Sequence, residues 1–103
     1  MYQVFNTIGD ETVTITSLRE KGSWIRIVNP TKAELVKISS ETGALLEFLE
    51  APLDDEERPR IEVDCNQVLF IINIPIVIKN GTFKYDTLPL GIILTETQII
   101  TVC

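Results

Sequence analysis

Residues 68–78, which read VLFIINIPIVI, decide the fold class of this chain. The run is rich in β-branched residues and shows no alternation of apolar and polar side chains. A strand that is covered on both faces has this composition. Asn80-Gly81 follows directly, and this dipeptide is the strongest short signal for a β-hairpin. The sequence therefore predicts a long buried strand that turns back into the next strand.

Shorter strand patterns lie on both sides of this run, at 2–7, 12–18, 24–28, 61–65, 83–87, 90–95 and 98–103. Gly9-Asp10 supplies turn chemistry between the first two, which predicts a hairpin. Trp24 opens the third strand, and we expect its large aromatic ring to lie in the core. Residues 61–65 alternate strictly, so we expect Ile61 and Val63 to pack inward from a half-buried strand.

Two short helices are predicted after the third strand. Thr31 and Glu34 have the spacing of a capping box, and Gly43 fits the left-handed position that ends a helix. Residues 44–50 form a second amphipathic pattern, which Pro52 ends. The predicted fold class is α/β (α+β): a mixed β-sheet of about seven strands with two short helices inserted after the third strand, in one domain over residues 1–103.

Composition narrows the functional classes. The chain has 103 residues, with fifteen acidic and nine basic side chains, a net charge of −6 and no histidine. Nucleic-acid binding needs clustered Lys and Arg, which the sequence lacks. Without histidine, the most frequent general base and metal ligand is missing, so we do not expect an enzyme. The N-terminus has no signal-peptide pattern, and no run is apolar enough to span a bilayer, so we expect a cytosolic domain with reduced thiols at Cys65 and Cys103.

Nine of the fifteen acids fall between Glu41 and Asp64, where only Arg58 and Arg60 balance them. Carboxylate oxygens are ligands for hard cations such as magnesium. The same pattern also fits a solvated helix end and turn, in which Arg58 pairs with Glu56 or Glu57. An EF-hand is excluded, because a loop that begins at Asp54 lacks the required glycine and the final glutamate. The residues alone leave both interpretations open.

The stretch 53–62, LDDEERPRIE, is the most specific part of a wider pattern. Taken with residues 24–30, 34–35, 43–49, 68–78, 90–94 and 99–102, it resembles the N-terminal cytoplasmic domain of the CorA family of magnesium and divalent-cation transporters. In that family a long stalk helix and two membrane helices follow this domain. The resemblance implies that the 103 residues conduct no ion by themselves.

The resemblance also implies a role. The domain would lie at the cytoplasmic face of the cell membrane, in a homopentamer, and would contribute regulation and assembly. Magnesium would be the regulatory ion. The sensing acids of the family fall at Glu50 and Ala51, and alanine cannot ligate a metal. We therefore expect Glu50, Glu47, Asp54 and Asp55 to be the candidate metal ligands, with weak binding by the isolated chain.

Two alternatives stay open, namely a free-standing soluble interaction domain and the corresponding domain of a zinc-transporting relative. A further expectation concerns assembly. The two predicted helices suffice to cover one face of the sheet only, and a large exposed apolar face is seldom tolerated on a soluble monomer. We therefore expect the isolated chain to bury the second face against another copy, as a dimer or tetramer.

Overall fold

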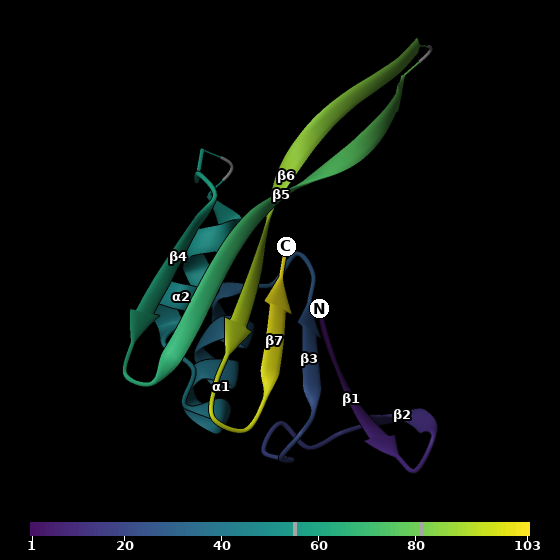
Figure 1. Ribbon diagram of the computed structural model, residues 1–103. Helices are drawn as coiled ribbons and strands as arrows, with labels where there is room; N and C mark the ends of the chain where they lie inside the picture. Colours follow the sequence, from purple (N-terminus) through teal and green to yellow (C-terminus); the bar gives the residue numbers. More distant parts are fainter. Residues whose placement is uncertain (55, 81) are drawn as a thin grey trace.

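A computed structural model of the chain describes residues 1–54, 56–80 and 82–103 (Figure 1). Within these ranges, a seven-stranded sheet carries two helices and one 3-10 turn on a single chain. In chain order the elements are β1 (Tyr2–Ile8), β2 (Glu11–Ile15), β3 (Trp24–Ile27), α1 (Lys32–Thr42), α2 (Leu46–Glu50), η1 (Ala51–Leu53), β4 (Arg60–Asp64), β5 (Gln67–Asn80), β6 (Thr82–Leu94) and β7 (Ile99–Val102). The predicted fold class, with its helices after the third strand, is confirmed.

The sheet is mixed, with the strand order β2-β1-β3-β7-β6-β5-β4. Strands β3 and β7 run parallel, with Trp24 opposite Ile99, and the other neighbouring pairs are antiparallel. The first and last thirds of the chain thus meet at the centre of the sheet. This parallel pair joins the N-terminal hairpin to the C-terminal strands.

Helix α1 begins and ends as the sequence predicts. The Glu34 backbone N–H donates to Thr31 Oγ1 at 3.2 Å, and the Thr31 N–H donates to Glu34 Oε1 at 2.9 Å. The Thr31 N–H, together with the N-terminal ammonium, lowers the pKa of Glu34. Gly43 has φ 76°, and its N–H donates to the Ser39 carbonyl at 2.9 Å. The capping box and the glycine stop are therefore confirmed.

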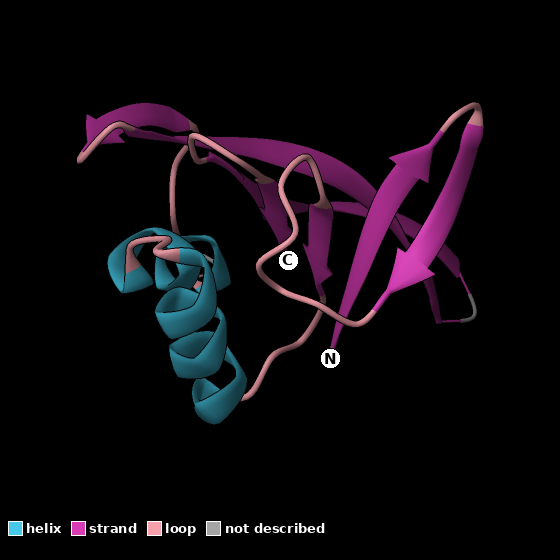
Figure 2. Ribbon diagram, turned by 90° about the horizontal axis from the view of Figure 1, so that it is seen from below, coloured by secondary structure: helices cyan, strands magenta, loops and turns pink. Residues whose placement is uncertain are grey.

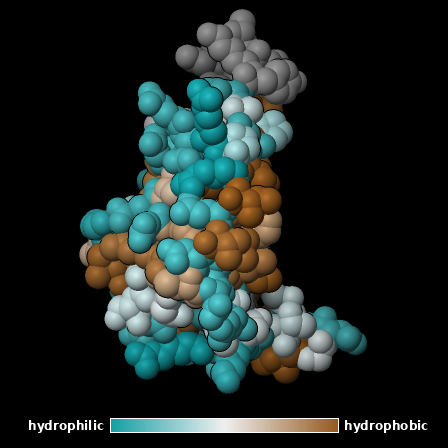
Figure 3. Space-filling view, turned by 60° about the vertical axis from the view of Figure 1, so that its left-hand side comes forward, coloured by the Kyte–Doolittle hydropathy of each residue, from teal (hydrophilic) through white to brown (hydrophobic). Residues whose placement is uncertain are grey.

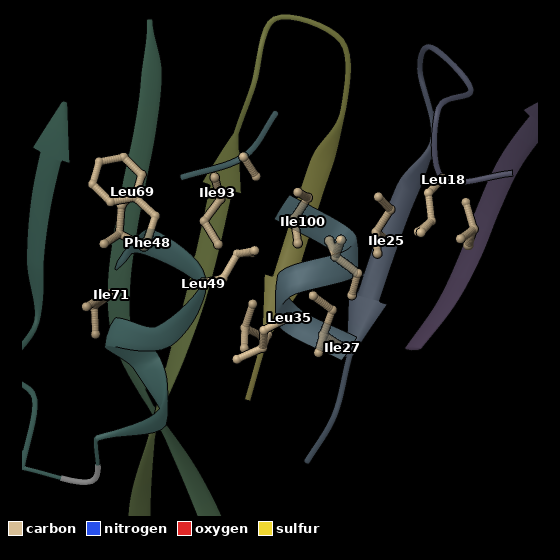
Figure 4. Close-up of a cluster of buried hydrophobic side chains, with 14 residues drawn as sticks. Leu18, Ile25, Ile27, Leu35, Phe48, Leu49, Leu69, Ile71, Ile93 and Ile100 are labelled. Carbon is tan, nitrogen blue, oxygen red and sulfur yellow. The ribbon is translucent and has the colours of Figure 1, made fainter. Parts of the chain in front are cut away.

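Both helices lie on the same side of the sheet (Figure 2). The core fills the space between the two layers, and its side chains point from β1, β3, β5, β6 and β7 toward α1 and α2 (Figure 4). Leu35 and Ile38 come from α1, and Phe48 and Leu49 from α2. Strand residues that meet them include Ile25, Ile27, Leu69, Ile71, Ile93, Ile100 and Val102, which are all buried.

Trp24 does not lie in this core, so that prediction is wrong. Its side chain is 41% exposed, because Ile25 and Ile27 take the inward positions of β3. The ring lies on the opposite face, with its centroid 5.0 Å from that of Phe5. Its Nε1–H donates to Thr101 Oγ1 at 2.9 Å. Truncating Trp24 should therefore cost less than the 3–5 kcal/mol typical of a buried aromatic residue.

The inward packing predicted for Ile61 and Val63 is also wrong. These side chains are 68% and 69% exposed. The register of β4 places Glu62 opposite the buried Leu69, so Glu62 shares the helix-covered face and its two apolar neighbours face away. Alternation predicts that Ile61 and Val63 share a face, but it does not say which face the helices cover.

Strands β5 and β6 pair with each other beyond the ends of their outer neighbours β4 and β7. The runs predicted at 83–87 and 90–95 form the single strand β6, and Pro89 is accommodated opposite Asn73. Strand β4 pairs with β5 only as far as Ile71, and β7 pairs with β6 only from Gly91 onward. Beyond these points β5 and β6 continue as a two-stranded arm that projects from the sheet (Figure 1). The prediction that residues 68–78 are covered on both faces is therefore wrong, because Ile72 and Val77 are 42% and 53% exposed. The predicted turn at Asn80-Gly81 includes Gly81, which lies outside the described residues.

Candidate metal site

The candidate carboxylates lie on α2 and in the segment between α2 and β4. Glu50 ends α2, and its Oε2 accepts a hydrogen bond from Lys32 Nζ at 2.8 Å. Asp54 follows η1, and its Oδ1 accepts from the Glu56 backbone N–H at 3.0 Å. Asp55 lies outside the described residues. Glu50 and Asp54 thus have local partners in the chain.

Glu47 lies three residues before Glu50 on the same helix. The negative charge of Glu47 acts on the thiol of Cys65, which lies in the turn between β4 and β5. The pKa of the Cys65 thiol is raised, chiefly by its hydrogen bond to the Asp64 carboxylate, with a smaller contribution from Glu47. Across the described parts of the chain, no three Cys, Asp or Glu side chains come together as a metal-binding group. Among the described candidates, Glu47, Glu50 and Asp54 therefore belong to no such group within one chain.

Ala51 occupies the position at which the resemblance implies a second sensing acid. Its side chain is half-buried and packs against the hydrophobic core. Neighbouring Pro52 is buried within η1, where it lies against β6. This short segment anchors the end of α2 to the sheet and offers no ligand at Ala51.

The ion pairs of the Arg-Pro-Arg element are made by Arg60. Its Nε–H donates to Glu57 Oε1 at 2.7 Å, and its Nη1 bonds to Glu62. Hydrogen bonds to Glu57 and then Glu62 raise the pKa of Arg60. The pairs join the acidic segment to β4, whereas the expected pairing at the turn involved Arg58. Such solvent-exposed pairs contribute little stability each.

Sequence reasoning overlooked Gln67, the buried first residue of β5. Its Nε2 donates to the Gly43 carbonyl at 2.7 Å, and its Oε1 accepts from the Leu45 N–H at 2.9 Å. One amide thus satisfies one backbone carbonyl and one backbone N–H of the link between α1 and α2. The signal was a lone Gln at the start of an otherwise apolar run. This side chain sets where α2 begins, and with it the position of Glu47 and Glu50.

A pocket of about 330 Å³ lies at the base of the arm, between η1 and the end of β7. Its walls are mainly apolar and include Pro52, Leu53, Leu88 and Pro89. Cys103 is the only titratable side chain among its lining residues.

Both the sequence and the fold of the chain are similar to those of CorA transport proteins. No family model matches the chain. The cobalt/magnesium transport protein CorA of Methanocaldococcus jannaschii is 32% identical over 79 residues, which are 77% of this chain and 24% of the relative. The solved soluble domain of CorA from the same organism superposes with a TM-score of 0.76 at 26% identity, over 99% of this chain and 40% of that one.

The chain is a CorA-like domain. The complete structure of the CorA magnesium transporter from M. jannaschii gives a TM-score of 0.78 at 22% identity, again over 99% of this chain and 32% of that one. The CorA-like domain thus spans about a quarter of the curated relative and about two fifths of the solved soluble domain. None of its described helices is long and apolar enough to cross a membrane.

Proposed function

We propose that residues 1–103 form the regulatory and assembly domain of a homo-oligomeric divalent-cation transporter, at the cytoplasmic face of the cell membrane. The observation that carries this proposal is the superposition of 99% of the chain on the soluble domain of CorA, at a TM-score of 0.76. The ion class comes from the name of the relative, a cobalt/magnesium transport protein. In this proposal the domain catalyses no reaction and conducts no ion.

Electrostatics supplies the regulatory mechanism. Carboxylates on adjoining subunits repel one another, and a bridging dication removes that repulsion, which links ion concentration to subunit geometry. Glu47, Glu50 and Asp54 do not converge within one chain, which supports a site completed by a second subunit. In the pentamer that the resemblance implies, Glu50 would be the principal ligand of magnesium, with Glu47, Asp54 or Asp55 beside it.

The isolated chain should bind magnesium only weakly. Ala51 cannot ligate, Glu50 is already paired with Lys32, and the described residues hold no group of three carboxylate or thiol ligands. Titration calorimetry should show no saturable heat in the micromolar range. Tight binding that is lost in Glu50→Gln and kept in Glu20→Gln, an exposed acid outside the candidate segment, would contradict this prediction.

A chimera tests the transport role. The CorA-like domain replaces the matched segment of M. jannaschii CorA, and the chimera is expressed in a bacterial strain that needs high external magnesium for growth. We expect the chimera to restore growth at low magnesium, and the 103-residue chain alone to fail. A chimera that reaches the membrane as well as the parent but supports no growth would contradict the proposal and favour a free-standing interaction domain.

A further inference from the structure

Lys32 and Glu50 form an ion pair that joins the two helices. Lys32 Nζ donates to Glu50 Oε2 at 2.8 Å, although the two residues are eighteen positions apart in the sequence. Lys32 is the first residue of α1 and Glu50 is the last residue of α2, so the start of one helix is held to the end of the other. The cation therefore lies on the carboxylate that the proposed function makes the principal ligand of magnesium.

Helix stability explains neither of these two charges. The helix dipole disfavours a cation near the first turn of a helix and an anion near the last turn. Lys32 begins α1 and Glu50 ends α2, so each residue stands at the end where its charge is opposed. The acid that suits the first turn of α1 is Glu34, which completes the capping box. Lys32 and Glu50 thus compensate each other, and the pair is the feature that calls for a function.

The chemistry of Glu50 fits a hard dication. Its carboxylate is partly exposed, and carboxylate oxygens are the ligands that magnesium takes in proteins. Figure 3 brings the edge of the molecule with β4 and α2 forward, and much of that surface is hydrophilic. Within the described residues, Lys32 is the one basic side chain that pairs with an acid of α2. A protonated amine has no acceptor, so Lys32 cannot ligate a metal itself. Lys32 and a dication are therefore alternative partners of the same carboxylate.

We propose that Lys32 competes with magnesium for Glu50 and thereby sets the ion concentration at which the regulatory site fills, an inference that rests on the proposed function. For Glu50 to ligate a dication, Lys32 must either leave the carboxylate or stay beside it as a repelling charge, and both lower the apparent affinity. An exposed ion pair is worth little, so the expected effect is about two- to fivefold in magnesium affinity, or about 0.4–1 kcal/mol.

Magnesium binding to the purified chimera, measured by titration calorimetry, tests the proposal. Glu50→Gln defines the heat that does not depend on this carboxylate. We expect Lys32→Gln to lower the magnesium concentration at half saturation of the remaining, Glu50-dependent heat by about two- to fivefold. Lys32→Arg keeps a cation at the start of α1 and should stay close to the unmodified chimera. Circular dichroism of each variant checks that the fold is retained.

Arg19→Gln is the matched control, because it removes one positive charge from another exposed ion pair. Arg19 Nε donates to Glu41 Oε2 at 2.5 Å, and the two side chains are 71% and 35% exposed, against 64% and 43% for Lys32 and Glu50. Arg19→Gln should leave half saturation unchanged. Equal shifts in Arg19→Gln and Lys32→Gln, or no shift in Lys32→Gln, would overturn this inference and leave the proposed function standing. Binding that Glu50→Gln does not alter would refute the proposed function, and this inference with it.

Discussion

Replacing Gly91 with alanine is expected to lower the free energy of unfolding by about 1–3 kcal/mol, the usual cost of overpacking. Gly91 lies in β6, where Pro52 of η1 packs directly on the strand. A Cβ atom at position 91 would overlap Pro52 Cγ and lie 2.8 Å from Pro52 Cβ. The proline ring is rigid, so the backbone of η1 or β6 must move. Urea unfolding, followed by circular dichroism, measures the effect.

A second substitution shows whether this contact is the cause. In Pro52→Gly the ring is gone, so adding Gly91→Ala should cost nearly nothing, and the double-mutant cycle should show strong coupling. Gly9→Ala controls for the general loss of a glycine. Its φ is 63° and no atom lies near its missing Cβ, so any cost there reflects backbone strain and not packing. Equal costs of Gly91→Ala with and without Pro52 would contradict the packing argument.

Leu49→Ala should destabilise the domain by about 2–5 kcal/mol, the range for a truncated buried leucine. Leu49 is fully buried in α2 and points toward the sheet (Figure 4). Because α2 has only five residues, it cannot persist without its packing. The position of Glu47 and Glu50 therefore depends on this side chain. Urea unfolding of the purified variant measures the loss.

The matched control is Leu53→Ala, since Leu53 is exposed at the end of η1. It should cost well under half as much as Leu49→Ala. Equal losses of unfolding free energy in Leu49→Ala and Leu53→Ala would contradict the packing of Leu49 in the core.

The sequence predicted helix α1 correctly because the interactions that start and end it involve residues close together in the chain. The capping box at Thr31 and the left-handed Gly43 act within a few residues, and both are found as expected. Trp24 and the apolar pair of β4 failed for a shared reason. A strand pattern shows which residues lie on the same face, but only tertiary packing decides which face α1 and α2 cover.

The candidate metal site could be predicted from the sequence less well than the fold. Nine acids in a short segment show where negative charge is dense, but not which carboxylates converge. In the structure Glu50 pairs with Lys32, and the charge of Glu47 acts on Cys65 in the β4–β5 turn. The partner of Glu50 is eighteen residues away, and no spacing rule predicts it. Residues that complete a site from a neighbouring subunit are equally invisible in one sequence.

The central claim is that this CorA-like domain regulates ion entry. Cobalt uptake by the chimera described above, measured in vesicles as internal magnesium is raised, tests it most directly. We expect uptake to fall several-fold with rising internal magnesium, and Glu50→Gln to weaken this inhibition without reducing uptake at low magnesium. Uptake that stays constant across the magnesium range, in a chimera that transports as fast as the parent, would contradict the account.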